Sequence, residues 1–370
     1  MTLRRLGLVV NPIAGMGGPI GLKGTDGWTA AELERLGALP SSGARAARAL
    51  SELSGLGRVE VLTAAGSMGE ESVTIAGHTP RVVHVAPGPR TTAHDTTTAV
   101  REMVRAGCDL VLFAGGDGTA RDIARAVGQA TVVLGIPTGV KMHSAAFAVS
   151  PTAAGALAAA FIADRILTTR DAEVVDLDEE AYRNGLISVR LFGYVKVPDR
   201  AESLQGSKVR SLGDDEAIAE IGEEIAGRLR LGGGYAIGPG TTAKAALGAL
   251  GLSQSLLGVD LVVDGTVVGM DMSAADLLTA TADMRIGLVV SPIGGQGHVF
   301  GRGNQQLSPQ FLRRVGCGGI IIVASPRKLA SMRGRPLFID TGDRDLDRAL
   351  VGYARVVTGR RREVVYALSD

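Results

Sequence analysis

The stretch Leu110-Val111-Leu112-Phe113-Ala114-Gly115-Gly116-Asp117-Gly118-Thr119 decides the fold of this chain. Its apolar half predicts a buried strand, and its glycines predict a turn in which the backbone comes close to a ligand. Helical spacing follows over residues 120–127, so the amides at that helix N-terminus form a site for an anion. A carboxylate among such amides repels a phosphate unless it holds a metal ion or accepts a proton. The stretch therefore predicts an α/β fold and phosphoryl transfer.

Short apolar strands alternate with amphipathic helices through the first half of the chain. Continuous apolar strands separated by helices are typical of a mostly parallel, doubly wound sheet with helices on both faces. In such a sheet the functional loops follow the carboxyl ends of the strands. The predicted strands are 6–10, 59–62, 81–85, 109–113 and 132–136, and the predicted helices are 45–53, 92–105, 120–127 and 151–167.

The pattern changes near residue 168, where we expect the boundary between two domains. Residues 1–167 are predicted to form an α/β nucleotide-binding domain, and residues 168–370 a β-rich, antiparallel domain whose last segment is a candidate to return to the first. Asp264-Gly265 predicts a tight turn between two strands. The strands predicted in this half are 173–177, 186–197, 259–263, 266–268 and 285–290, with helices at 213–230 and from about 240 to 250.

The composition excludes several classes of protein. Lys and Arg number 39 against 38 Asp and Glu, so the formal net charge of +1 gives no basic field for nucleic acid. Cys108 and Cys317 form neither a disulfide framework nor a metal-ligand spacing. No signal peptide follows Met1, and the longest apolar stretch, 153–162, is too short to span a bilayer. We therefore expect a cytoplasmic protein.

Common nucleotide fingerprints are missing from the sequence. No Gly-x-x-x-x-Gly-Lys-Ser/Thr loop is present, and no Gly-x-Gly-x-x-Gly follows a predicted strand. A nucleotide would have to be bound in another way. The loop 115–119 is the strongest candidate, with Asp117 as a catalytic base or as a carboxylate that helps to hold Mg²⁺. The amides of Gly115, Gly116 and Gly118 and the hydroxyl of Thr119 are candidates for holding phosphate oxygens. A tight strand-to-helix turn capped by Thr119 is the structural alternative.

Four other glycine-containing loops supply further candidates for nucleotide or phosphate binding. Lys141 would neutralise phosphate charge, and Arg302 offers fixed donors. Flexible loops and simple helix capping are the alternatives, and His143 is interpreted as a polar residue at a helix start rather than as a base. The candidates are Asn11, Gly15 and Gly17 after the first strand, Thr138 and Lys141 after the fifth, Gly240, Thr241 and Thr242 at a helix start, and Arg302 and Asn304 in the loop 294–306.

Together these loops resemble the NAD kinase superfamily, which includes diacylglycerol and sphingosine kinases and is distantly related to 6-phosphofructokinases. The resemblance rests on the loop 115–119, on Asn11-Pro12, and on Gly240-Thr241-Thr242-Ala243, which is similar to a Gly-Ser-Thr-Ala turn of NAD kinases. Three longer segments, at 11–18, 135–141 and 301–306, resemble a long prokaryotic branch labelled ATP-NAD kinase-like and related to the acetoin-catabolism X protein. The resemblance spans nearly the whole chain.

The resemblance implies an α/β domain followed by a β-rich domain, an active site in the cleft between them, and a homodimer or homotetramer. It also implies that Asp117 activates an acceptor hydroxyl while ATP with Mg²⁺, or polyphosphate, donates the phosphate. The 2′-hydroxyl of NAD is the first expected acceptor. The chain lacks the Asn-Glu or Asn-Asp pair that holds the dinucleotide in better-known NAD kinases, since Asn11, Asn184 and Asn304 are not followed by an acid. A lipid or polyol kinase and a non-catalytic nucleotide-binding regulator therefore remain alternatives.

Overall fold

The chain divides into two compact units. Unit 1 comprises Met1–Met16 and Gly24–Ser207, and unit 2 comprises Gly17–Lys23 and Lys208–Asp370. The computed structural model describes residues 3–22, 24–25, 27–56, 59–88, 90–128, 131–139, 142–164, 168–177, 189–200, 204, 214–255 and 257–370.

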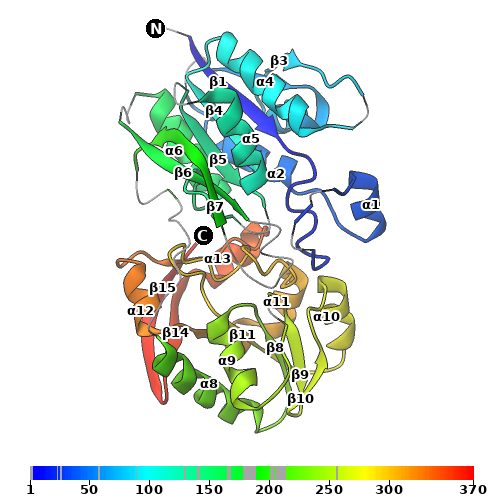
Figure 1. Ribbon diagram of the computed structural model, residues 1–370, viewed down its shortest axis with the longest axis vertical. Helices are drawn as coiled ribbons and strands as arrows, with labels where there is room; N and C mark the ends of the chain where they lie inside the picture. The colour runs from blue at the N-terminus through cyan, green and yellow to red at the C-terminus, as the bar shows by residue number, and fades with distance from the viewer. Residues whose placement is uncertain are drawn as a thin grey trace. The chain divides into compact units, whose positions relative to one another are not determined.

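Unit 1 contains a five-stranded parallel sheet with the order β3-β2-β1-β4-β5 (Figure 1). The strand order reverses between β1 and β4, and open α/β sheets bind ligands at such a point. The prediction of a doubly wound parallel sheet is confirmed. The strands are β1 (Arg4–Val10), β2 (Val59–Ala64), β3 (Pro80–His84), β4 (Leu110–Gly115) and β5 (Val133–Pro137). The helices are α1 (Ala30–Arg35), α2 (Ser42–Ser51), α3 (Glu70–Ile75), α4 (Ala93–Arg105), α5 (Asp117–Val127) and α6 (Pro151–Ile162).

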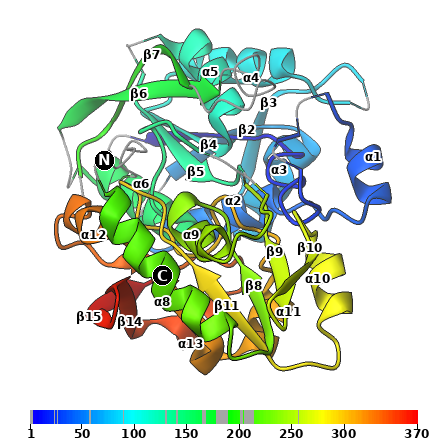
Figure 2. The ribbon, with the colours of Figure 1, turned by 60° about the horizontal axis from the view of Figure 1, so that its bottom comes forward.

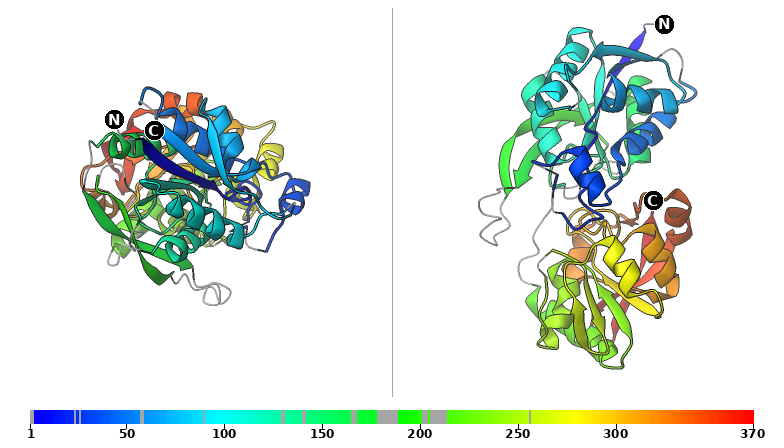
Figure 3. Two further views of the ribbon diagram at one scale, coloured as in Figure 1. Left: turned by 90° about the horizontal axis from the view of Figure 1, so that it is seen from above. Right: turned by 90° about the vertical axis from the view of Figure 1, so that its right-hand side faces the viewer.

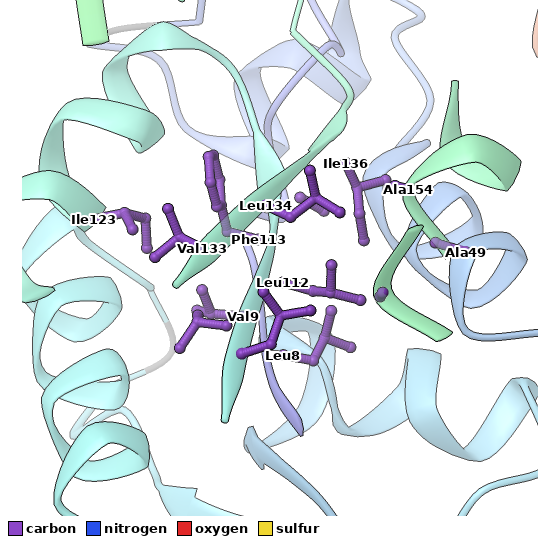
Figure 4. Close-up of a cluster of buried hydrophobic side chains, with 14 of the residues drawn as sticks. Leu8, Val9, Ala49, Leu112, Phe113, Ile123, Val133, Leu134, Ile136 and Ala154 are labelled. Carbon is purple, nitrogen blue, oxygen red and sulfur yellow. The ribbon is translucent and has the colours of Figure 1, made fainter. Parts of the chain in front are cut away.

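Alternating side chains of the central strands fill a core on each face of this sheet. Figure 4 shows Val9, Phe113 and Val133 on the side of Ile123 from α5, and the leucines of the same strands on the side of α2 and α6. At the contact of α2 with α6, a Cβ on Gly155 would lie only 2.0 Å from the carbonyl oxygen of Ala49. Helix α6 ends at Ile162, and residues 165–167 of the longer predicted helix lie outside the described residues.

Strands β6 (Thr169–Leu177) and β7 (Val189–Pro198) form an antiparallel hairpin that belongs to unit 1. Figure 3 shows this hairpin in green against the blue and cyan elements of the unit. Val174 and Val195 join the same apolar core as β4 and α5, and Ala145 N donates to Glu173 O at 2.9 Å. The expected boundary near residue 168 therefore precedes this hairpin, because the change of pattern there marks a change of element and not of core.

Unit 2 contains an eight-stranded mixed sheet with the order β10-β9-β8-β11-β12-β14-β15-β13. Its centre, β8-β11-β12-β14, is parallel. The prediction of an antiparallel domain is therefore wrong for the centre, although the hairpin of β9 with β10 is antiparallel as expected. The strands are β8 (Gly234–Ile237), β9 (Asp260–Val263), β10 (Thr266–Gly269), β11 (Ile286–Val290), β12 (Ile320–Val323), β13 (Leu337–Phe338), β14 (Gly352–Gly359) and β15 (Arg362–Ser369).

Helices cover both faces of the sheet in unit 2. Helices α8 and α9 lie side by side over one face (Figure 2), where Ile225 and Leu247 share a core with Val289. Phe311 and Leu277 belong to a second core with Leu288. The helices of this unit are α8 (Asp215–Leu229), α9 (Thr241–Ala249), α10 (Ala274–Ala280), α11 (Pro309–Val315), α12 (Pro326–Ser331) and α13 (Arg344–Leu350).

The C-terminal segment belongs to unit 2 and does not return to unit 1. A short piece from near the N-terminus, Gly17–Lys23, also belongs to unit 2. Ala274 N, at the start of α10, donates to Pro19 O at 2.8 Å. A Cβ on Gly18 would lie 2.9 Å from the Cβ of Gln305, so glycine allows close packing there. None of the helices in the described part of the chain has the length and apolarity that crossing a membrane requires.

Candidate functional site

Loops that follow β1 and β4 meet at the point where the strand order of unit 1 reverses. Asn11 N donates to Ala114 O at 2.9 Å, which fixes the start of the first loop beside the end of β4. The side chain of Asn11 donates from Nδ2 to Thr119 Oγ1 at 3.1 Å and accepts from Ile13 N at Oδ1. Two residues predicted separately from the sequence, Asn11 and Thr119, are therefore in direct contact.

The loop after β5 joins the same edge of the sheet through close backbone contacts. Thr138 N and Gly139 N both donate to Gly115 O at 3.2 Å. Gly15 has a φ of +83°, and a Cβ there would lie 2.1 Å from Thr138 O. A Cβ on Gly139 would lie 2.7 Å from the Cα of Gly116. These glycines are required for the loops to pack against one another, whatever their relation to a ligand.

Asp117 is buried and its carboxylate accepts hydrogen bonds from the loop after β5. Oδ2 accepts from His143 N at 2.7 Å and lies 3.1 Å from His143 Nδ1. Oδ1 accepts from Ser144 N at 3.0 Å and from Ser144 Oγ at 2.7 Å. Asp117 is the first residue of α5, where a carboxylate is stabilised by the positive end of the helix dipole.

Ser144 connects this carboxylate to the β6–β7 hairpin. Its Oγ accepts a hydrogen bond from Val175 N at 3.1 Å, and Val175 is part of β6. Arg121, one turn after Asp117 on α5, donates from Nη1 to Asp176 Oδ2 at 2.8 Å. These bonds attach the hairpin to the loop 143–144 and to α5.

The carboxylate of Asp117, predicted to act as a base or to help hold Mg²⁺, has several hydrogen-bond donors around it within the protein. The backbone amides of His143 and Ser144 and the side chains of both residues contact its two oxygens, although the one hydroxyl proton of Ser144 also has Val175 O as an acceptor at 2.9 Å. Asp117 holds the loop 143–144 in place.

Thr138 offers a polar group that the described part of the chain does not satisfy. Its side chain is buried, with 4% of the residue exposed, and Oγ1 has no hydrogen-bond partner among the described residues. A buried hydroxyl without a partner is destabilising, so a ligand oxygen is the natural partner. Gly118 lies in the first turn of α5, and Lys141 lies outside the described residues.

In unit 2, three loops that follow neighbouring parallel strands meet around Lys328. Its Nζ donates to Thr242 Oγ1 at 3.0 Å and to Ser291 Oγ at 2.8 Å. Gly240 precedes α9 with a φ of +106°, and Thr241 begins that helix. Sequence reasoning missed Lys328, because Ser-Pro-Arg-Lys-Leu carries no glycine-rich signature. The strand β12 before it was not predicted either.

The start of α9 is anchored by a buried ion pair. Lys244 Nζ donates to Asp260 Oδ2 and, at 3.4 Å, to Ile237 O. Burial alone would raise the pKa of Asp260, but hydrogen bonds from Lys244, Ser255 and the backbone of Asp271 hold it below its usual value. This pair fixes the turn that contains Thr241 and Thr242.

Arg302 and Asn304, both predicted to contact a ligand, also have partners within the protein. Arg302 Nη2 lies 3.0 Å from Asp340 Oδ2, and both side chains are buried. Asn304 donates from Nδ2 to Val299 O at 2.7 Å and accepts from Gly301 N at 3.1 Å. These bonds stabilise the loop 294–306. Gly17 lies in the segment grouped with unit 2, where its carbonyl accepts from Leu22 N.

Comparison with known proteins gives a clear family assignment. No individual curated protein matched the chain. The family model for the ATP-NAD kinase N-terminal domain matches residues 6–166, and the model for the ATP-NAD kinase C-terminal domain matches residues 234–368. The first match contains the loops around Asp117, and the second contains the turn at Thr242 and the cluster at Lys328. The chain therefore belongs to the NAD kinase family.

Proposed function

We propose that this protein is a kinase that transfers a phosphoryl group from ATP with Mg²⁺, or from polyphosphate, to the 2′-hydroxyl of NAD, giving NADP. Membership of the NAD kinase family supports the reaction class. We further propose that it acts in the cytoplasm as a homodimer or homotetramer. Sedimentation of the purified chain would test the assembly.

The observation that carries this proposal is the convergence of three loops at the switch point of the unit 1 sheet. The loops that follow β1, β4 and β5 bring Asn11, the turn at Gly115–Gly116, and Thr138 to one edge. Backbone amides and hydroxyls donate hydrogen bonds to phosphate oxygens, and such donors stabilise the negative charge of a phosphoryl group during its transfer. The buried, unpartnered Oγ1 of Thr138 supports a ligand oxygen at this place.

A substrate screen tests the proposal directly. The full chain would be incubated with Mg²⁺ and either ATP or polyphosphate, together with NAD, NADH, a diacylglycerol, a sphingoid base or a polyol. We expect NADP to form from NAD. Phosphorylation of a lipid or polyol instead would favour the other kinases of the superfamily. Nucleotide binding without any transfer would contradict the proposal and favour a regulator.

Replacing Asp117 tests whether the carboxylate at the switch point is required. We expect Asp117→Asn to lower kcat by about 10² to 10⁴-fold, the usual range for loss of acid–base assistance, because the amide keeps the shape but not the charge. ATP affinity, measured by titration calorimetry, should be unchanged. The control is Asp122→Asn on the same helix, whose carboxylate pairs with Arg121 and Arg125. Equal kcat in Asp117→Asn and Asp122→Asn would contradict the role of Asp117.

A further inference from the structure

Strand β15 has an outer edge that the described part of the chain leaves largely unpaired. Its inner edge pairs with β14 along the whole hairpin, whereas on the outer edge β13 reaches only Leu368 and Ser369. The outward N–H and C=O groups of Arg362–Ala367 therefore have no strand partner among the described residues. Figure 2 shows β14 and β15 in red at one side of unit 2. Such a row of unpaired groups is a template for another strand.

The sequence of this edge lacks the usual protection against pairing. Native edge strands are short, bulged, or interrupted by lysine or proline. The strand at the other end of the same sheet follows this rule, since β10 has four residues and an irregular register with β9. Strand β15 has eight residues, and Val364-Val365-Tyr366 in its middle contains neither a charge nor a proline. On one face of the hairpin, 67% of Val365 and 82% of Tyr353 are exposed.

We infer that β15 pairs with β15 of a second copy of this chain, antiparallel and about a twofold axis at Val364. This contact goes beyond the proposed reaction and specifies the surface of the proposed assembly. The occupant of the edge has to be a strand, and a second copy offers one with the same unpaired row. An axis at Val364 pairs Arg362–Tyr366 of each copy and stops short of the residues that β13 holds. Such a contact closes on itself, because each copy uses the same surface.

The charges on the hairpin complement one another across this axis. Arg355 lies beside Val365 in the register of β14 with β15, and the axis places the partner's Glu363 on the other side of Val365. The two charged residues are then two strand spacings apart, about 10 Å, which an arginine and a glutamate side chain span together. The Arg355 side chain is 81% exposed and lies 3.6 Å from Glu363 of its own chain. Pairing therefore places each Arg355 between two carboxylates of opposite charge to its own.

The other positions of this register also fit. Val364 lies opposite its own copy, and Arg362 lies opposite the partner's Tyr366 on the same face of the extended sheet. β-Branched side chains suit a pleated surface, and an arginine is attracted to an aromatic ring. Like charges directly opposite one another would be destabilising, and no position from Arg362 to Tyr366 places them so.

A charge at the axis tests the contact in the full chain. Val364→Lys places two ammonium groups opposite each other, so we expect the Kd of the dimer, measured by sedimentation equilibrium, to rise by about 10-fold or more. Circular dichroism should show that the fold is kept. Val268→Lys is the matched control, since Val268 is a valine of β10 with 57% exposure at the other end of the sheet. An unchanged Kd in Val364→Lys, or an equal rise in Val268→Lys, would overturn the inference.

An exchange of charges shows whether the contact crosses between chains. Arg355→Glu makes the two positions that meet across the axis both acidic, and Glu363→Arg makes them both basic. Each variant alone should therefore associate more weakly than the wild type. A 1:1 mixture restores opposite charges on both sides of the axis, so we expect heterodimers, which a mass tag on one variant makes visible. A mixture that associates no better than its components, with both variants folded, would overturn the inference.

The state of the wild-type chain separates the inference from the proposed function. A wild-type dimer that persists in Val364→Lys is held by another surface, and this result would overturn the β15 contact alone. A wild-type chain that is monomeric at every concentration would overturn both the contact and the proposed assembly. Phosphoryl transfer by such a monomer would leave the proposed reaction standing.

Discussion

At the scale of single residues, removing the hydroxyl of Thr138 tests whether that group binds a ligand or supports the fold. Because Oγ1 is buried without a partner among the described residues, Thr138→Val should raise the free energy of unfolding by about 1 kcal/mol. The same change should raise KM for the donor or the acceptor by about 10 to 100-fold, as expected when a hydrogen bond to a charged group is lost. Urea unfolding and steady-state kinetics measure the two effects.

Thr63 is the matched control for this substitution. It is equally buried in unit 1, but its Oγ1 donates to Leu8 O at 3.0 Å. Thr63→Val should therefore lower the free energy of unfolding by about 1 kcal/mol and leave KM unchanged. If Thr138→Val were destabilising to the same extent with an unchanged KM, Thr138 would be a structural residue and its hydroxyl would not face a ligand.

Some candidate residues of unit 1 that the sequence singled out separately are in contact in the structure, and their ligand roles stay predictions. Asn11 and Thr119 meet because the ends of neighbouring parallel strands lie at one edge of a sheet, which the strand order makes predictable. The engagement of Asp117 by His143 was not predictable, since it depends on the path of a loop 26 residues away. The ion pair of Arg302 with Asp340 was not predictable either, because it joins residues 38 positions apart in the sequence; the predicted phosphate contact of Arg302 stays a prediction.

At the scale of elements, the contact of the β1 loop with the end of β5 is the most sensitive junction of the site. Gly15 has a φ of +83°, and a Cβ there would meet Thr138 O at 2.1 Å. Gly15→Ala should therefore lower the free energy of unfolding by the roughly 1–2 kcal/mol that a left-handed conformation costs a residue with a Cβ. The energy needed to move the β5 loop should lower it further. Phosphoryl transfer should fall with it, because the loop carries Thr138.

Gly37 is a control that separates the cost of a left-handed conformation from the cost of moving a neighbouring loop. Its φ is +86°, and no atom of the described residues lies within 4 Å of the place that a Cβ would occupy. Gly37→Ala should lower the free energy of unfolding only by the cost of the left-handed conformation, and it should keep full activity. Urea unfolding of both variants measures the difference, and equal losses of stability in the two would show that the β1 loop does not press on the end of β5.

The sheet strands and longer helices of unit 1 were predictable because each strand is a continuous apolar run bounded by helical spacing, whereas α1 and α3, with six residues each, were not predicted. In unit 2 the central strands β8 and β12 have only four residues each, and helices such as α10 and α12 have six or seven. Periodicity cannot be established over such short segments. The hairpin of β9 and β10 was found because Asp264-Gly265 marks its turn, and it suggested an antiparallel domain whose parallel centre remained unrecognised.

At the scale of the whole molecule, the division into units follows the cores and not the change of sequence pattern. The β6–β7 hairpin looks like the start of a new domain, yet Val174, Val195 and Val197 are buried in the core of unit 1. The apolar pattern of a segment indicates whether it forms a helix or a strand. The core that the segment joins depends on contacts with residues distant in the sequence. The exchange of Gly17–Lys23 into unit 2 is of the same kind, since nothing in its composition distinguishes it from the loop before it.

Separate cores predict separate unfolding transitions. Phe113 is fully buried in the core of unit 1 and Phe311 in that of unit 2, so each substitution by alanine should remove about 3–5 kcal/mol from one unit only. Domains with their own cores commonly unfold independently. Hydrogen exchange in urea, followed peptide by peptide, should show Phe113→Ala lowering the protection of β1, β4 and β5, and Phe311→Ala that of β8, β11 and β12. A single transition shifted equally across both units by either variant would show that they fold as one cooperative body.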